Sequence, residues 1–255
     1  MTDNVTGATP ASERSGYAPL TNLRLMLAAL LKTQEAVDGS SRFCVLYGRS
    51  GYGKSTAAAY VAARFDATYV QARSVETQRS FLEMLADELG IAAPARTTPK
   101  LLQQILDQIA ADPRPIIIDE MDYLVSKKFA DLIRDLHEGS TVPIVLIGEE
   151  AFPSRLKAWE RFDNRVLTFV AAQPASADDA RQLRDYYCSR VSVADDLVDY
   201  INEQCKGVVR RIVVNLREVQ TTALDEGQLT ADRAWWGNRP LLTTDAPARR
   251  GKAAA

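Results

Sequence analysis

Short apolar runs alternate with amphipathic segments along the N-terminal part of the chain. Apolar residues bounded by turn residues predict buried strands at 43–47, 68–71, 115–119 and 142–147. Apolar residues at helical spacing predict a first helix that begins near Thr21, which would be its N-cap. The same spacing predicts further helices at 54–65, 77–89, 99–111 and 127–137. This alternation predicts a parallel sheet covered by helices on both faces.

The pattern changes at Pro174. The following residues show helical periodicity alone, which predicts helices at 178–189, 193–205, 208–224 and 231–236. Both ends of the chain are rich in small and polar residues and are predicted to be flexible. We therefore expect an α/β core at 20–173 and a small all-α lid domain at 174–236, between flexible segments at 1–19 and 237–255.

Composition excludes several classes of protein. The formal net charge of −2 gives no global attraction to nucleic acid or anionic membrane, so any such contact needs a local basic patch. Three cysteines without metal-ligand spacing and a single histidine, His137, argue against a zinc site. His137 lies on a predicted helix and is expected to be structural or exposed. No signal peptide and no apolar run long enough to span a bilayer are present, which predicts a soluble, cytoplasmic protein.

A glycine-rich turn joins the first predicted strand to the following helix. Residues 48–55 match the pattern G-x-x-x-x-G-K-[ST], whose backbone N–H groups surround phosphates. The helix N-terminus adds a favourable dipole. In this pattern Lys54 reaches the β- and γ-phosphates and the Ser55 hydroxyl ligates Mg²⁺. The sequence therefore predicts that ATP and Mg²⁺ bind to Gly48, Arg49, Ser50, Gly51, Tyr52, Gly53, Lys54, Ser55 and Thr56.

Two acids follow a second apolar strand. Asp119 ends the run at 115–119 and Glu120 follows it, and ligands of open parallel sheets bind beyond the carboxyl ends of the strands. Asp119 is predicted to hold Mg²⁺, and Glu120 to polarise a water toward the γ-phosphate. The alternative is a solvated acidic turn.

These two motifs resemble the Walker A and Walker B motifs of AAA+ ATPases, and the resemblance covers roughly residues 20–235. It implies a sensor residue after the next strand, where Glu149 departs from the usual Asn, Thr or Ser. A carboxylate there would repel the γ-phosphate. Three alternatives follow: Glu149 points away from the nucleotide, ATP hydrolysis is slow, or the sensor residue lies one or two positions away from Glu149.

The same resemblance implies arginines in two places and a polar residue in a third. Arg161 or Arg165 would enter the site of a neighbouring subunit, with Arg161 favoured. Arg210, in the run Gly207–Arg211, would be the sensor 2 arginine, which the lid places over the nucleotide. Gln71 could restrain Glu120, and a solvent-facing glutamine is the alternative. For Arg161 and Arg165, the alternative is an ordinary surface arginine on a helix.

Several runs resemble the DNA-transposition ATPases of the phage Mu transposition protein B group. They are 48–56, 119–124, 133–138, 147–150 and 161–165. The resemblance implies an ATPase of a bacterial or phage-infected host cytoplasm that binds duplex DNA without sequence preference. It also implies assembly into rings or helical filaments and stimulation of a transposase. About 20 residues precede the first predicted helix, so we expect no counterpart of the N-terminal helix-turn-helix domain of the phage Mu protein.

DNA contacts would then come from the core itself. Candidates are Arg73, Lys100, Lys127 and Lys128, which could pair with phosphates. Solvated charges at helix starts are the alternative.

Other functions remain open at this point. A small-molecule kinase would need a lid inserted within the core, whereas this lid is C-terminal. A nucleotide-gated scaffold with little hydrolysis fits the unusual Glu149. An AAA+ ATPase of replication or secretion type fits the P-loop, although no winged-helix or membrane segment is recognised after the lid.

Overall fold

Five short strands form the central sheet of the computed structural model, which describes residues 18, 20–36, 42–125, 129–157, 159 and 164–242. They are β1 (Phe43–Tyr47), β2 (Thr68–Gln71), β3 (Ile116–Asp119), β4 (Ile144–Gly148) and β5 (Val166–Ala171). The sheet is parallel throughout, in the order β2-β3-β4-β1-β5. Because parallel strands need crossover connections, helices cover both faces of the sheet.

The two faces carry separate apolar clusters. Helices α1 (Thr21–Gln34) and α2 (Lys54–Phe65) pack on one face, where Ile117 is buried. Ile116 and Ile118 point to the opposite face, since successive side chains of a strand alternate. That face is covered by α3 (Gln78–Glu88), α4 (Thr98–Ala111), α5 (Asp122–Val125), α6 (Ala130–Ser140) and α7 (Phe152–Lys157).

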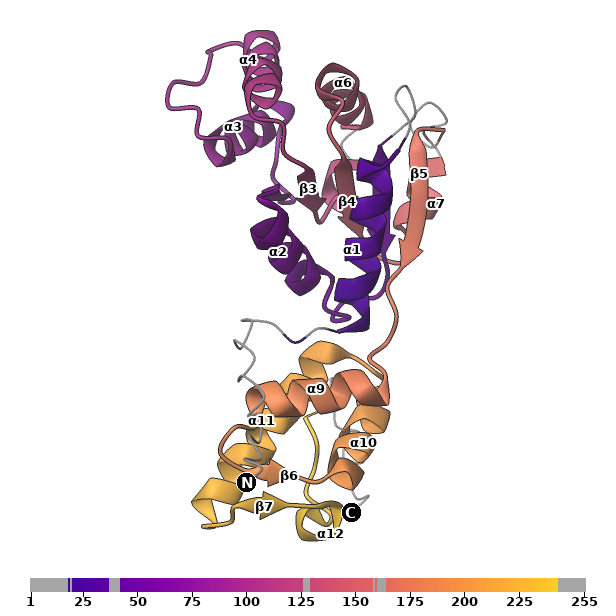
Figure 1. The fold of residues 1–255 in the computed structure, drawn as a ribbon, viewed down its shortest axis with the longest axis vertical. Helices are drawn as coiled ribbons and strands as arrows, with labels where there is room; N and C mark the ends of the chain where they lie inside the picture. Colours follow the sequence, from indigo (N-terminus) through magenta and orange to yellow (C-terminus); the bar gives the residue numbers. More distant parts are fainter. Residues whose placement is uncertain are drawn as a thin grey trace, which may run out of the picture.

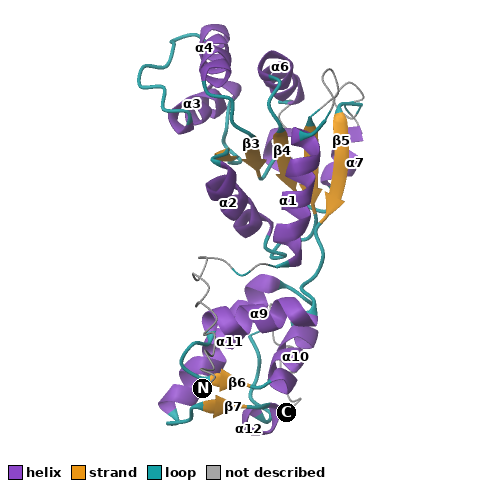
Figure 2. Ribbon diagram, viewed as in Figure 1, coloured by secondary structure: helices purple, strands orange, loops and turns teal. Residues whose placement is uncertain are grey.

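A second lobe follows β5 and lies beyond the ends of α1 and β5 (Figure 1). It contains α9 (Ala177–Tyr187), α10 (Asp195–Gln204), α11 (Val209–Asp225) and α12 (Arg233–Trp236) around its own apolar cluster. We call this lobe the lid and the first lobe the core. Figure 2 also shows a small pair of strands at the far end of the lid, β6 (Ser192–Val193) and β7 (Thr230–Ala231).

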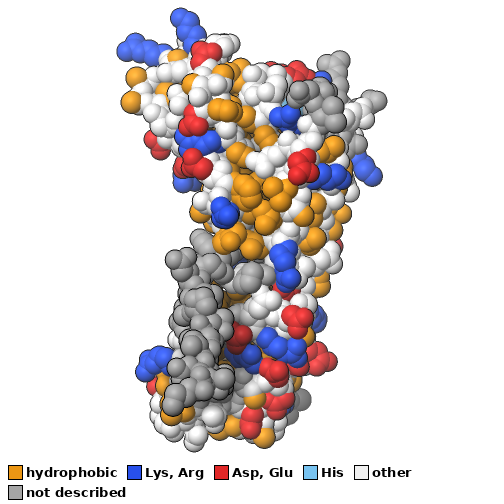
Figure 3. All heavy atoms as spheres, in the orientation of Figure 1, with side chains coloured by type: hydrophobic (Ala, Val, Ile, Leu, Met, Phe, Trp, Pro, Cys, Tyr) orange, Lys and Arg blue, Asp and Glu red, His pale blue; other side chains and the backbone are white. Residues whose placement is uncertain are grey.

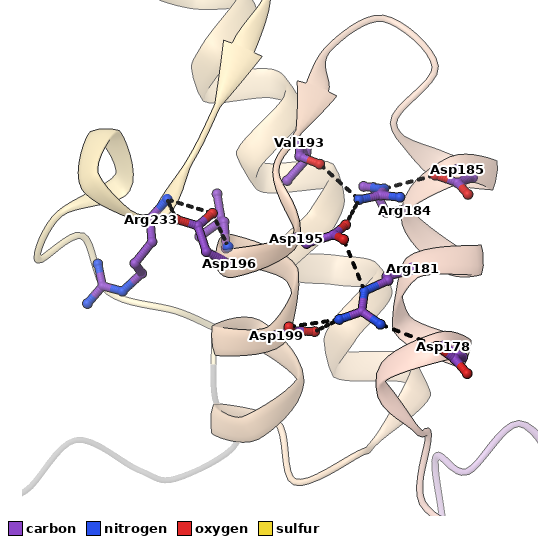
Figure 4. Close-up of polar contacts among 10 residues, drawn as sticks. Asp178, Arg181, Arg184, Asp185, Val193, Asp195, Asp196, Asp199 and Arg233 are labelled. Carbon is purple, nitrogen blue, oxygen red and sulfur yellow. Dashed lines mark hydrogen bonds and ion pairs between the residues drawn. The ribbon is translucent and has the colours of Figure 1, made fainter.

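Ion pairs join the first two lid helices. Arg181 and Arg184 project from α9 toward α10 (Figure 4). The Arg181 guanidinium lies 2.9 Å from Asp199 and 3.4 Å from Asp195, and Arg184 also pairs with Asp195. These partly exposed ion pairs link the two helices within the lid.

The structure differs from the sequence expectations in several places, and two of the differences are the short helices α5 and α7, which were not predicted. The largely apolar run at 166–171 is not among the predicted strands, yet it forms β5, a half-buried strand at the edge of the sheet. The strands β6 and β7, two residues each, add to a lid expected to be all-helical. Thr21 is the first residue of α1 rather than its N-cap, which is Leu20.

None of the helices in the described part of the chain is long and apolar enough to cross a membrane.

Candidate functional site: a nucleotide cavity between core and lid

The glycine-rich turn lies between β1 and α2 and carries a backbone that glycine permits. Gly51 and Gly53 both have φ of +84°, in the left-handed region that other residues rarely adopt. A Cβ atom on Gly51 would lie 2.8 Å from the Val208 side chain of the lid. The glycine therefore allows both the tight turn and the close approach of the lid.

Lys54 begins α2 and folds over the turn. Its Nζ donates hydrogen bonds to the carbonyl oxygens of Gly48, at 2.7 Å, and Arg49, at 3.0 Å. Burial lowers the pKa of Lys54, and the nearby carboxylates of Asp119 and Glu120 oppose this shift. The ammonium group thus sits among acids at the carboxyl ends of the strands.

The acid pair at the end of β3 is held by hydrogen bonds. Asp119 is 2% exposed, and its Oδ1 accepts the backbone N–H of Glu120 at 2.8 Å. Its Oδ2 accepts the hydroxyl of Tyr69, a residue of β2, at 3.0 Å. Glu120 has φ of +56°, a left-handed conformation that is uncommon for a non-glycine residue.

Burial, and then the neighbouring Asp119, raise the pKa of Glu120, whereas Lys54 lowers it. A carboxylate with a raised pKa is a better proton acceptor than a solvated one.

Glu149 directly follows β4 and lines the same cavity. Its backbone N–H donates to Asp122 Oδ2, and Arg155 donates to Asp122 Oδ1 at 3.0 Å. Asp122 therefore fixes the segment that carries Glu149. The predicted sensor position does face the candidate site, with a carboxylate that contributes to the raised pKa of Glu120.

The lid contributes one face of α11. Arg210, Val213, Val214 and Arg217 are spaced at i, i+3, i+4 and i+7 and all line the cavity. The backbone N–H of Arg210 donates to Gly51 O at 3.2 Å, so the start of α11 rests on the glycine-rich turn.

Arg217 lies two turns further along α11, about 10 Å from Arg210 along the axis. Its guanidinium carbon is 4.7 Å from the ring centre of Tyr187, which also lines the cavity.

Core and lid enclose a cavity of about 420 Å³. Its core side is formed by Ser50, Gly51, Gly53, Lys54, Ser55, Thr56, Asp119, Glu120, Gly148 and Glu149. Its lid side adds Leu183, Tyr186 and Tyr187 to the α11 residues, and Ala18 and Leu20 lie before α1. The cavity therefore joins a phosphate-binding type of turn, three acids and two lid arginines, with an apolar and aromatic region beside them.

The remaining residues predicted for this site are Gly48, Arg49 and Tyr52, which belong to the turn but do not line the cavity. Tyr52 is buried, with 8% of its surface exposed. Arg49 is exposed and lies 4.0 Å from Glu150. Gly48 follows β1, and its carbonyl oxygen is an acceptor for Lys54.

The other predicted residues lie elsewhere. Arg165 is not among the cavity-lining residues and pairs with Glu138 of α6. Arg73 follows β2, Lys100 lies on α4, and both are exposed. Gln71 is exposed at the end of β2, as in the solvent-facing alternative. Arg161, Lys127 and Lys128 lie outside the described residues.

Charged side chains of both signs are interspersed on the face seen in Figure 3, where Lys and Arg do not gather into one continuous basic surface.

Sequence reasoning missed three residues that organise the site: Asn22, Tyr69 and Asp122. Asn22 of α1 donates to Tyr52 O at 2.8 Å and to Gln173 O at 2.7 Å. Asn22 lies on the same buried face of α1 as Met26 and Ala29. A polar amide on an otherwise apolar helix face was the signal in the sequence that could have identified it. The contacts of Tyr69 and Asp122 depend on strand order, which periodicity does not give.

Comparisons with known proteins agree with this geometry. Residues 37–156 match the AAA domain family. A search of curated proteins finds no match.

Among solved structures, the chain is similar to Aeropyrum pernix Orc2 in its ADPNP–ADP complexes. The identity is 17% and the TM-score 0.65, over 84% of this chain and 63% of that one. It is also similar to Aeropyrum pernix Orc1 in complex with DNA, with 21% identity and a TM-score of 0.61 over 84% and 62%.

The Thermotoga maritima RuvB Holliday junction branch migration motor is 16% identical, with a TM-score of 0.56 over 83% and 64% of the two chains. This chain therefore spans less than two thirds of the length of each of these three proteins. The core has the α/β P-loop fold of AAA domains, with a five-stranded parallel sheet between helices.

Proposed function

We propose that this chain is an ATPase that binds ATP in the cavity between core and lid and uses it to control assembly on duplex DNA. The observation that carries the proposal is the meeting of Lys54, Asp119, Glu120 and Arg210 around one cavity. Similarity to the Orc2 structure with bound ADPNP and ADP supports the choice of nucleotide.

Mg²⁺ fits the residues that this cavity offers. Ser55 and Asp119 both line it and provide the hard oxygen ligands that Mg²⁺ prefers. Among the described residues, no group of three or more His, Cys, Asp or Glu side chains forms a metal site by itself. Mg²⁺ is commonly held by one or two carboxylates together with substrate phosphates. Bound there, Mg²⁺ would neutralise charge on the β- and γ-phosphates.

The proposed reaction is hydrolysis of the terminal phosphoanhydride bond. A water oxygen attacks the γ-phosphorus, the bond to the β-phosphate oxygen breaks, and ADP and inorganic phosphate leave. Glu120 orients the water and accepts its proton, a role that the raised pKa of Glu120 favours. Lys54 and Arg210 supply positive charge to the phosphate oxygens. Glu149 adds a negative charge at the cavity, which favours slow basal turnover.

DNA is the proposed macromolecular partner. One similar structure is described as Orc1 in complex with DNA, and another as a Holliday junction branch migration motor. We infer a sequence-nonspecific contact through phosphates, with Arg73 and Lys100 as the described candidates and Lys127 and Lys128 as further ones.

Self-assembly into a ring or filament would bring Arg161 or Arg165 of one subunit to the site of the next. Arg165 lies outside the cavity of its own chain, as a role in trans requires.

Two processes fit this activity. A replication-type role is favoured by the Orc proteins among the similar structures. A role in transposition, with a transposase as partner, rests on the motif resemblance at 119–124 and 133–138.

Competition between different DNA duplexes for the protein distinguishes the replication-type role from the transposition role. A transposition-type protein reads phosphates and is displaced equally by any duplex, whereas an initiator with a defined site is displaced best by that site.

The test is a gel-shift and filter-binding series with ATP, ADP or no nucleotide, on unrelated duplexes at rising salt. Retention that needs ATP and falls steeply with salt supports the proposal, and absence of nucleotide-dependent binding to every duplex rejects the DNA role. The Glu120→Gln variant should still bind ATP and DNA but should lose ATP hydrolysis. The control variant Glu150→Gln, a change outside the cavity, should keep ATP hydrolysis. Wild-type binding without turnover would make the protein a nucleotide-gated scaffold.

A further inference from the structure

Tyr69 and Asp119 lie on the same face of the sheet. In the parallel pairing of β2 with β3, Tyr69 is opposite Ile117, and Asp119 is two residues further along β3. Since side chains alternate along a strand, Tyr69, Ile117 and Asp119 point to the face covered by α1 and α2. A diagonal contact of this kind is within reach of an aromatic side chain.

The contact completes the hydrogen bonding of a buried carboxylate. The Tyr69 hydroxyl donates to Asp119 Oδ2 at 3.0 Å, and the Glu120 amide donates to Oδ1 at 2.8 Å. Because Asp119 is 2% exposed, the two donors fix the plane of its carboxylate in place of water.

We infer that Tyr69 is a positioning residue that orients the Asp119 carboxylate to receive Mg²⁺ at the nucleotide cavity. This inference rests on the proposed function, because it gives Asp119 a metal to hold. Outer-shell partners of metal ligands typically alter metal affinity by about 10–100-fold when they are removed. Tyr69 would act in this way without touching nucleotide, since it is not among the residues that line the cavity.

The experiment is a titration of Mg²⁺ against binding of a fluorescent ATP analogue. Tyr69→Phe removes the hydroxyl and keeps the ring, so the Mg²⁺ concentration for half-maximal binding should rise by about 10–100-fold. Affinity for the analogue in EDTA should stay within about twofold. The matched control is Tyr60→Phe, the same change in a partly buried residue of α2 on the same face. An unchanged or lowered Mg²⁺ requirement in Tyr69→Phe overturns the inference.

A double-mutant cycle tests whether Tyr69 acts through Asp119. In an Asp119→Asn background, Tyr69→Phe should add no further change in Mg²⁺ requirement, whereas independent, additive effects contradict the inference. Thermal unfolding without ligand is recorded in parallel, because a merely structural role would lower the melting temperature and leave the Mg²⁺ requirement alone. If the wild-type protein shows no Mg²⁺-dependent nucleotide binding, the proposed function fails and this inference falls with it.

Discussion

Asn22 is the residue whose replacement tests most directly how the glycine-rich turn is held. Its side chain makes three hydrogen bonds from α1. Two are donated to Tyr52 O and Gln173 O, at 2.8 and 2.7 Å, and one is accepted from Gln173 N at 2.8 Å. Tyr52 belongs to the turn, and Gln173 to the segment that leads from β5 into the lid. One amide therefore ties the turn, the first helix and the lid connection together.

The size of the effect follows from these contacts. Each hydrogen bond contributes about 1 kcal/mol net, so Asn22→Leu, a change of similar volume, should lower the free energy of unfolding by about 3 kcal/mol. Burial makes the loss larger rather than smaller, because Asn22 is 5% exposed and water cannot easily replace the amide. At a slope of about 2 kcal/mol per molar urea, the midpoint should fall by about 1.5 M.

The assay is urea unfolding followed by circular dichroism, with Thr33→Val as control. Thr33 is a fully buried polar residue of the same helix, but within the described part of the chain its hydroxyl bonds the carbonyl of Leu30 alone, at 2.6 Å. The control should lose at most about 1 kcal/mol. A loss below about 1 kcal/mol in Asn22→Leu, or one no larger than in the control, would refute the reasoning. ATP affinity should also weaken in Asn22→Leu, because the carbonyl of Tyr52 loses its partner.

Three further changes probe the cavity and the core. Gly51→Ala should weaken ATP binding in fluorescence titrations, because its Cβ meets the lid at 2.8 Å. Gly90→Ala has a similar positive φ with no atom within 4 Å, so equal effects of the two changes would contradict this. Arg210→Ala should slow ATP turnover by about tenfold or more, whereas Arg211→Ala, outside the cavity lining, should not. His137 accepts a backbone N–H at Nε2, and burial lowers its pKa. Its contribution to stability should be complete above about pH 6.5 and decline as pH falls below that value, and His137→Gln should reduce this slope in melting experiments.

The expectation for His137 illustrates a general feature of this chain. The sequence indicated that it is structural or exposed, and the structure shows it 9% exposed and stacked on Phe43 at 4.3 Å. Its buried surroundings come from α6 packing against β1, two elements that are far apart along the chain.

Local sequence determined the parts of this protein that depend on neighbouring residues. The inner strands, the helix after the glycine-rich turn and the pair Asp119–Glu120 follow from periodicity and from a motif of adjacent residues. Tertiary structure decided the rest, because strand order and lid docking join residues remote in sequence. Thr21 donates to Asp179 across 158 positions, and Tyr69 reaches Asp119 across 50. Such contacts depend on which strands are paired and on how the lid closes over the core, and periodicity carries no information about either.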